Sequence, residues 1–255
     1  MNEDEKKYQI ALTLIEGVGD VIGKKLLAFT GSAKAVFFAK RSELEKIEGI
    51  GKILVKAILS ADVLTRAVQE LKWMEKEGVN HLFYADKHYP NRLKQCEDAP
   101  LNLFYKGNID WNKDKFISIV GTRKASSFGK QFTNELVKEL APYNPVIVSG
   151  LAHGIDVAAH KAALQYGLKT IAVFAHGLDK IYPSAHATIA KTIIANGCLL
   201  TDYLSGTVAL PQHFVSRNRI VAGLSDATIV IESAAKGGSL ITADIANSYN
   251  REVFA

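Results

Sequence analysis

Short apolar runs alternate with amphipathic segments along the second half of this 255-residue chain. The apolar runs are typical of buried strands, and in the segments between them apolar residues recur every three or four positions, as in helices. We expect strands at 116–120, 146–148, 170–174, 198–200, 228–231 and 252–254, and helices at 127–140, 154–166, 187–195, 214–224 and 239–249. This alternation predicts an α/β fold, with a mostly parallel sheet covered by helices on both faces.

The first part of the chain has a helical pattern and contains a repeat. Residues 15–27 and 47–59 each carry a Gly-apolar-Gly turn followed by an amphipathic stretch. The repeat resembles the helix-hairpin-helix motif, in which backbone N–H groups at a helix N-terminus hold a DNA phosphate. The same glycines would also let two helices pack closely, and the balance of acidic and basic residues over 1–78 is nearly even, so both interpretations stay open.

Residues 79–115 contain short strand-like runs interrupted by prolines and a Gly-Asn turn, which indicates an irregular lead-in to the larger domain. We therefore expect a small, all-helical, SAM-like domain over residues 1–78 and the α/β domain over residues 79–255.

Composition narrows the classes of protein that fit. The net charge of +5 and a pI near 9.0 are compatible with a polyanionic partner. The sequence contains no apolar run long enough to span a membrane, and the polar N-terminus does not resemble a signal peptide. Cys96 and Cys198 lie far apart, which argues against a disulfide framework and favours the reducing cytoplasm.

Candidate chemistry lies in the loops after the strands, because ligands of parallel sheets bind beyond the carboxyl ends of the strands. These loops combine glycines, hydroxyl groups and cations, which suit a phosphate: backbone N–H groups and Arg or Lys side chains both favour an anion. The predicted phosphate-binding residues are Gly121, Thr122, Arg123, Ser149, Gly150, His153, Gly154, Lys180, Arg217, Asn218, Arg219, Lys236, Gly237, Gly238 and Ser239. We expect them to form one basic pocket with a floor of glycines.

Common nucleotide-binding motifs are absent from these loops. Seven residues separate Gly121 from Gly129, where a phosphate loop of a nucleotide triphosphatase has four, and Lys130 is followed by Gln131. The sequence also lacks Gly-x-Gly-x-x-Gly and an acidic residue placed to hold a ribose. We expect no cofactor.

Five of these segments together resemble the DprA family, also called Smf, the DNA-processing proteins of natural transformation. The segments are, in order, residues 121–123, 149–156, 177–183, 217–225 and 236–243. The resemblance covers about residues 80–255. It implies an extended Rossmann-like domain that binds and protects single-stranded DNA, forms a homodimer and loads the recombinase RecA. Family members commonly continue past the strand that begins at Glu252, and the sequence leaves open whether a C-terminal domain follows.

Side chains beside the cationic loops suggest how bases are held. Tyr182, His213 and Phe214 are flat groups on which unpaired bases can stack. The alternative is that they only pack at the rim of the fold.

An enzyme is not expected. Ile147 stands where a Gly-x-Ser-x-Gly nucleophile motif has its first glycine. The spacing of His153, Asp156 and His160 does not match common metal sites, and we expect Asp156 to interact with the first turn of its own helix. The alternative function is a nucleotide N-glycoside hydrolase of a related Rossmann-like superfamily. Glu232 would then supply the catalytic carboxylate; otherwise it pairs with Lys236 or loop amides.

Overall fold

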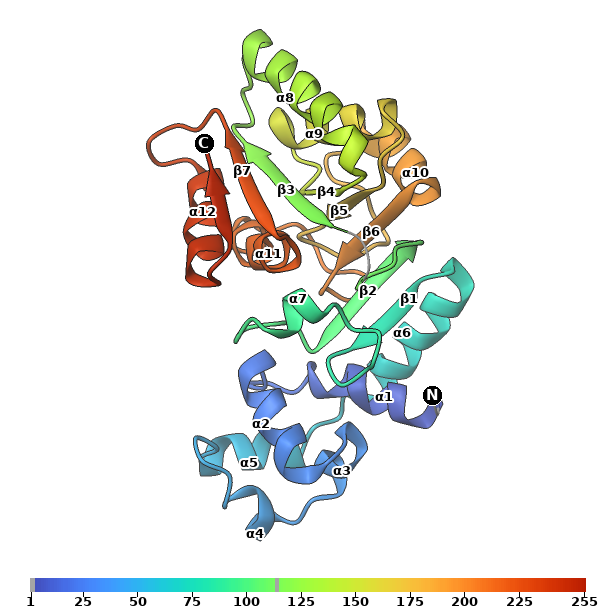
Figure 1. Ribbon diagram of the computed structural model, residues 1–255. Helices are drawn as coiled ribbons and strands as arrows, with labels where there is room; N and C mark the ends of the chain where they lie inside the picture. The colour runs from blue at the N-terminus through green and yellow to red at the C-terminus, as the bar shows by residue number, and fades with distance from the viewer. Residues whose placement is uncertain (1–2, 113–114) are drawn as a thin grey trace. The chain divides into compact units, whose positions relative to one another are not determined.

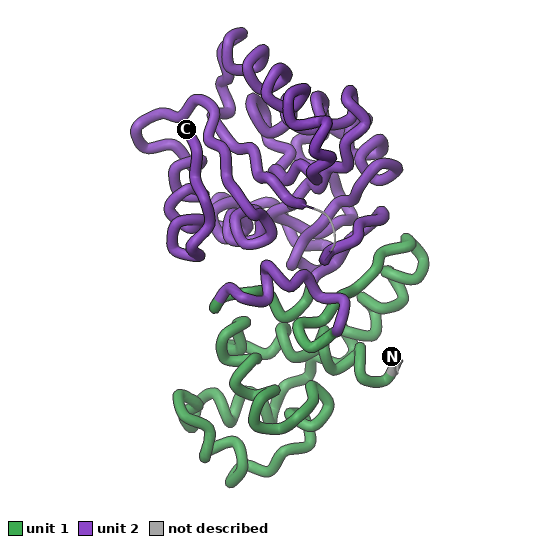
Figure 2. Tube along the Cα trace, in the orientation of Figure 1, with its two compact units in different colours: residues 1–86, 97–102 green, residues 87–96, 103–255 purple. Residues whose placement is uncertain are grey.

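The computed structural model describes residues 3–112 and 115–255, and the chain divides into two compact units (Figure 2). The first unit comprises residues 1–86 and 97–102, and the second comprises residues 87–96 and 103–255. A domain boundary after residue 78 remains a proposal, because this division does not show which segment folds independently.

The first unit is mainly helical. Its elements are α1 (Glu3–Leu12), α2 (Asp20–Thr30), α3 (Ala33–Phe38), α4 (Arg41–Leu44), α5 (Lys52–Leu59), α6 (Leu64–Glu77) and β1 (Asn80–Phe83). Apolar faces of these helices share one buried core, which includes Leu12, Leu26, Val36, Leu44 and Val55. Burial of such side chains supplies most of the stability of short helices, which are marginal alone in water.

The two repeats have the same local structure. Gly17 and Gly49 both have positive φ values, +81° and +83°, which side chains other than glycine rarely tolerate. A Cβ at Gly17 would lie 3.2 Å from the side chain of Leu54, and one at Gly49 would lie 3.3 Å from Nζ of Lys25. Each glycine therefore faces the helix of the other repeat, and its positive φ explains why glycine stands at this position.

The second unit is built around a sheet. Its strands are β2 (Asn102–Gly107), β3 (Phe116–Gly121), β4 (Val146–Ser149), β5 (Thr170–Val173), β6 (Gly197–Thr201), β7 (Ala227–Ile231) and β8 (Glu252–Phe254). They lie in the order β2-β6-β5-β4-β3-β7-β8. Neighbouring strands are parallel except for β2, which pairs antiparallel with β6. Residue Ile117 of β3 pairs with Ile147 of β4 on one side and with Ala227 of β7 on the other.

Helices cover both faces of this sheet (Figure 1). One face carries α8 (Ser127–Leu140), α9 (Ile155–Gln165) and α10 (Ala187–Ala195), and the other carries α11 (Pro211–Leu224) and α12 (Gly238–Ser248). The remaining short elements are α7 (Asn91–Lys94) and two 3₁₀ helices, η1 (Ala141–Tyr143) and η2 (Ser184–His186). The predicted α/β fold is confirmed. Within the described residues, none of the helices has both the length and the apolar character needed to cross a membrane.

Two elements differ from the sequence-based expectation. Helix α11 begins at Pro211, three residues earlier than predicted, because proline in the first turn needs no N–H partner and its φ suits a helix. Strand β2 lies in the segment that was predicted as an irregular lead-in, yet it extends the sheet as an antiparallel strand. An antiparallel strand of this kind is common in otherwise parallel sheets.

Candidate nucleic-acid interface

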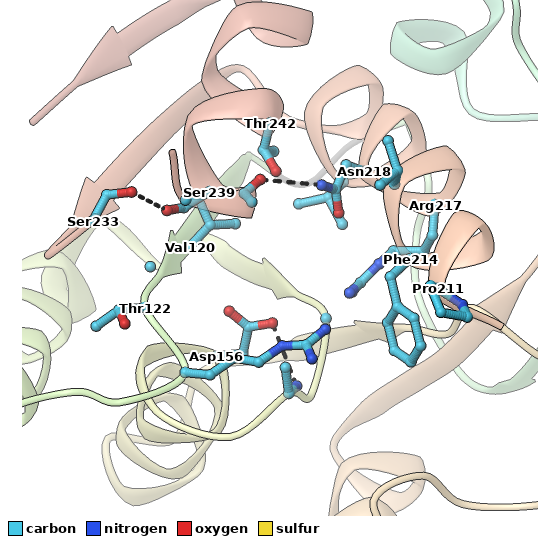
Figure 3. Close-up of a pocket in the computed structure, with 18 of the residues that line it drawn as sticks. Val120, Thr122, Asp156, Pro211, Phe214, Arg217, Asn218, Ser233, Ser239 and Thr242 are labelled. Atoms are coloured by element: carbon cyan, nitrogen blue, oxygen red, sulfur yellow. Dashed lines mark hydrogen bonds between the residues drawn. The ribbon is translucent and has the colours of Figure 1, made fainter. Parts of the chain in front are cut away.

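A pocket of about 500 Å³ opens beyond the carboxyl ends of β3, β4 and β7 (Figure 3). The chain continues from β3 into α8 on one face of the sheet and from β7 into α12 on the other, which leaves a crevice between the two strand ends. The predicted residues that line it are Gly121, Thr122, Arg123, Gly150, Arg217, Asn218, Gly237, Gly238 and Ser239. The structure thus brings together three strand-end loops and helix α11, which are distant in sequence.

The other predicted residues lie outside the lining. Ser149 is fully buried, and its hydroxyl donates a hydrogen bond to the carbonyl of Ile119 at 2.6 Å. Arg219 forms an ion pair with Asp202 at 2.6 Å. His153, Gly154, Lys180 and Lys236 are placed on neighbouring loop positions that do not line the pocket. Ser149 and Arg219 are therefore not expected to contact DNA, because their polar groups already bind Ile119 and Asp202.

Gly154 has a structural reason to be glycine. Its φ is +82°, and a Cβ there would lie 2.1 Å from the carbonyl oxygen of Thr122. The β4–α9 loop therefore packs directly against the β3–α8 loop. This contact holds the two loops that carry Arg123 and Gly150 at the same edge of the pocket.

Arg217 is a buried charge at the base of the pocket. Its residue is only 5% exposed, and Nη1 donates to the carbonyl of Val173 at 2.9 Å. A Cβ at Gly150 would lie 1.5 Å from Nη1, so only glycine leaves space for the guanidinium. Burial lowers the pKa of Arg217, while the charge of Asp156 acts in the opposite direction. Arg217 is thus fixed by the fold rather than extended towards solvent.

Asp156 faces Arg217 in the same pocket (Figure 3). Burial raises the pKa of Asp156, and the nearby Arg217 opposes that rise. The carboxylate accepts a hydrogen bond from the N–H of Ala152 at 3.3 Å. It therefore binds the β4–α9 loop, not the first turn of its own helix as the sequence suggested. Its negative charge balances part of the positive charge at the base.

The open rim of the pocket combines a cation with flat rings. The guanidinium of Arg123, which is exposed, lies 5.1 Å from the ring centre of Phe214. Tyr182 is 54% exposed, and its ring centre is 5.8 Å from that of Phe214. His213 instead packs against Tyr203, with ring centres 4.5 Å apart, and does not line the pocket. A stacking surface and an anion-binding group therefore lie side by side.

The sequence interpretation named Asn218 and Phe214 but missed other parts of the lining, including Asp156 and, on α11, Pro211 and Val215. Pro211, Phe214, Val215 and Asn218 all line the pocket. Their spacing of three, four and seven residues places them on one helical face. This periodicity was available in the sequence and indicates that one face of α11 forms a wall of the site.

Glu232 joins two loops beside the pocket. Its carboxylate accepts hydrogen bonds from the N–H of Ser126, at 2.9 Å, and from the Ser126 hydroxyl. Its own carbonyl accepts the N–H of Thr122 at 2.7 Å, and a Cβ at Gly129 would lie 2.4 Å from the carboxylate. Glu232 also has a positive φ of +50°. These contacts support the structural alternative for Glu232, in which it binds loop amides.

Glu232→Gln is expected to lower the thermal midpoint of the protein, because an amide replaces a charged acceptor. The Ser126 hydrogen bonds lower the pKa of Glu232, so its contribution to stability is present at neutral pH. That contribution is lost as pH falls through the lowered pKa. Thermal melts at pH 7 and at about pH 3 should show a larger difference between variant and wild type at pH 7.

Glu139→Gln on α8 is the control. Glu139 is exposed, and this substitution removes the same charge as Glu232→Gln. Equal midpoints for wild type and Glu232→Gln at pH 7 would contradict the structural role.

The described part of the chain contains no group of three or more His, Cys, Asp or Glu side chains placed to hold a metal ion. The donors gathered at the pocket are cations and backbone N–H groups, which suit an anionic ligand.

Comparison with known proteins identifies relatives of this chain. Protein Smf from Synechocystis is 34% identical over 259 aligned positions, covering 100% of this chain and 65% of the relative. The X-ray structure of DNA processing protein A (DprA) from Streptococcus pneumoniae matches with a TM-score of 0.83 and 34% identity, over 98% of this chain and 86% of that one. The chain spans 60–65% of the length of the first curated relatives that it matches.

A second solved structure concerns the single-stranded DNA binding mode of DNA processing protein A from Helicobacter pylori. It has a TM-score of 0.62 and 32% identity, and covers 69% of this chain and 79% of that one. Residues 80–255 match the family described as DNA recombination-mediator protein A. This match contains all the strands and helices that form the pocket, and the chain belongs to the DNA recombination-mediator protein A family, DprA/Smf.

Proposed function

We propose that this chain binds single-stranded DNA at the pocket, with the phosphate backbone at Arg123 and bases against Phe214 and Tyr182. The proposal rests on the rim of the pocket. The exposed guanidinium of Arg123 lies 5.1 Å from the ring centre of Phe214, and the half-exposed ring of Tyr182 lies next to Phe214. Single-strand binding without sequence preference needs this combination of backbone cations and stacking surfaces.

Backbone groups add to the attraction for phosphate. Helix α12 begins at Gly238, and Gly237, Gly238 and Ser239 all line the pocket. The first N–H groups of a helix have no partner within the helix, and the helix dipole favours an anion there. Nε of the buried Arg217 also has no hydrogen-bond partner among the residues that the structure describes. Positive potential therefore comes from both the rim and the base.

Preference for a single strand follows from the rings. Phe214 and Tyr182 can stack only on bases whose faces are available, whereas duplex bases are already stacked on one another. The phosphate contacts alone would not distinguish the two forms strongly. A gel shift that compares single-stranded with double-stranded oligonucleotides tests this preference, and equal affinity for both would contradict it.

Arg123→Glu is expected to lower affinity for an oligothymidine strand at least tenfold, equivalent to about 1.4 kcal/mol. The substitution removes the guanidinium from the rim and adds a negative charge towards the phosphates. The measurement is fluorescence anisotropy of a labelled strand at several salt concentrations. Wild-type affinity should fall as salt rises, with a logarithmic slope of about −0.7 for each contacted phosphate.

Lys138→Glu is the matched control for this charge reversal. Lys138 is exposed in the last turn of α8, away from the carboxyl ends of the strands. The Lys138→Glu variant should therefore retain wild-type affinity. An unchanged isotherm for Arg123→Glu would remove the pocket from the proposed site.

The wider role follows from family membership and remains a proposal. We infer that the protein acts in the cytoplasm by binding rather than catalysis, protects incoming single strands, forms a homodimer and loads RecA during natural transformation. The contacts of Glu232 with Ser126 favour this interpretation over the N-glycoside hydrolase, because they occupy the carboxylate that the hydrolase would use. Release of free base from a nucleoside monophosphate by the purified chain would contradict the non-enzymatic role.

A further inference from the structure

Two aromatic side chains lie exposed on the outer face of α8. Phe128 is 72% exposed and Phe132 is 44% exposed. Their ring centres are 6.1 Å apart, and the ring planes differ by 27°. The opposite face of the same helix buries Gly129, Thr133 and Val137. Because the helix is held by that buried face, its packing does not account for the pair of phenylalanines on the other side.

The segment that contains this pair and the loop before it carries positive charge. Arg123, Lys124 and Lys130 are all exposed, and residues 123–134 contain no acidic residue. Two acidic groups contact this segment: Glu232, whose carboxylate is bound by Ser126, and Glu135, whose carboxylate accepts a hydrogen bond from the side chain of Gln131 at 2.8 Å. The cations therefore adjoin the pair on the side of the loop that carries Arg123 and Lys124. An apolar surface next to such a loop is complementary to an unpaired nucleic-acid strand, whose bases are flat and whose backbone is anionic.

The pair also adjoins the proposed binding site. Helix α8 follows the carboxyl end of β3, where Arg123 lines the pocket (Figure 1). Phe128 lies five positions after Arg123 in the sequence, so their Cα atoms are at most about 18 Å apart. A few nucleotides of an extended strand span such a distance. A strand that leaves the pocket at Arg123 therefore has this pair within reach.

We propose that Phe128 and Phe132 form a second stacking platform for single-stranded DNA, outside the pocket, which holds nucleotides that have passed Arg123. This inference rests on the proposed function and extends its binding track along α8. The near-parallel rings offer a surface on which unpaired bases stack, and the exposed Arg123 and Lys124 precede them in the loop, where they can contact the adjoining phosphates.

The test is the dependence of affinity on strand length. Oligothymidines from about 4 to about 20 nucleotides, bracketing site sizes of known single-strand sites, are bound to wild type and to the double variant Phe128→Ala/Phe132→Ala. We expect the shortest strands that bind to show equal affinity for both proteins. The longest strands should bind the double variant at least fivefold more weakly. Arg123→Glu, in contrast, should weaken binding at every length.

Two further variants separate stacking from other effects. Tyr143→Ala removes an aromatic ring that is similarly exposed but lies in η1, beyond the other end of α8, and it should behave as wild type. Phe128→Tyr/Phe132→Tyr keeps both rings and should retain long-strand affinity. A third measurement uses a strand with 2-aminopurine at a nucleotide outside the part bound in the pocket. Wild type should quench the 2-aminopurine fluorescence, and the double alanine variant should not.

The outcomes distinguish the two proposals. Failure of the wild-type chain to bind any single strand would overturn the proposed function. Binding by wild type, with equal affinity of the double alanine variant at every length, would overturn only the stacking platform. The platform is also contradicted if the double variant changes the oligomeric mass in sedimentation and leaves long-strand affinity unaltered, since a second copy of the chain then covers the rings.

Discussion

Arg217→Met is expected to lower the free energy of unfolding by about 3 kcal/mol, the order of magnitude for leaving a buried charge without compensation. Methionine keeps most of the apolar volume but removes the guanidinium. The carbonyl of Val173 then loses its donor, and Asp156 remains buried without its opposing charge. Urea unfolding at pH 7 measures the loss. An Arg217→Met/Asp156→Asn double variant should be more stable than the sum of the two single effects, because it no longer leaves a buried charge.

Arg123→Met provides a matched control on the same pocket. Arg123 is exposed, so this substitution should change stability by no more than about 0.5 kcal/mol while weakening binding to a single strand. The two arginines are then separated by function: Arg217 supports the fold and Arg123 contacts the ligand. The reverse pattern, with Arg217→Met stable but deficient in binding, would show that the guanidinium of Arg217 serves the ligand directly.

Acidification from pH 7 to pH 5 is expected to destabilise the protein by about 2 kcal/mol through His160 alone. His160 is fully buried, and burial lowers its pKa to about 3. Nδ1 lies 2.7 Å from the hydroxyl of Thr170, which donates to the carbonyl of Ile147, so Nδ1 carries the proton. The positive charge of Arg217 also opposes a second proton on the ring.

The direction of this pH dependence follows from the pKa of His160, which is lower in the folded protein than in the unfolded chain. Below about pH 6.5 the unfolded chain takes up a proton at His160, whereas the folded protein does not. Stability is therefore complete at neutral pH and falls as pH decreases towards the folded pKa near 3. His160→Asn keeps a donor for Thr170 and removes the titration. The loss of stability between pH 7 and pH 5 should be about 2 kcal/mol smaller in this variant than in wild type.

NMR observation of the imidazole gives an independent check. The ring signals of His160 should not titrate between pH 7 and pH 5. A midpoint near pH 6.5 would contradict the burial argument, as would equal pH dependence of unfolding in wild type and His160→Asn.

The sheet and its helices were predictable because their signals are local. The runs at 146–148 and 228–231 are apolar on both faces, and the intervening helices have regular apolar spacing, so burial on a covered sheet follows directly. The strand-end loops could be placed at one edge from topology alone. The antiparallel strand β2 was not predictable in the same way, since its pairing with β6 joins residues nearly a hundred positions apart.

The candidate pocket was only partly predictable. Glycines at strand ends indicated that other groups approach the backbone closely there. In the structure, the guanidinium of Arg217 lies against Gly150, and the carbonyl of Thr122 lies against Gly154. The wall formed by α11 could have been recognised from its helical spacing. The buried carboxylate of Asp156 could not, because an acidic residue in the first turn of a helix is usually explained by the helix dipole.

The α/β architecture, the edge at which the loops meet and the mixture of glycines and cations there all follow from local patterns in the sequence. Which of these cations are exposed depends on the tertiary structure. Arg123, Arg217 and Arg219 have the same side chain, but the first is exposed at the rim, the second is buried and the third is paired with Asp202. Periodicity along a chain reports which side of an element is buried, whereas the availability of a charge depends on partners that the fold brings from distant segments.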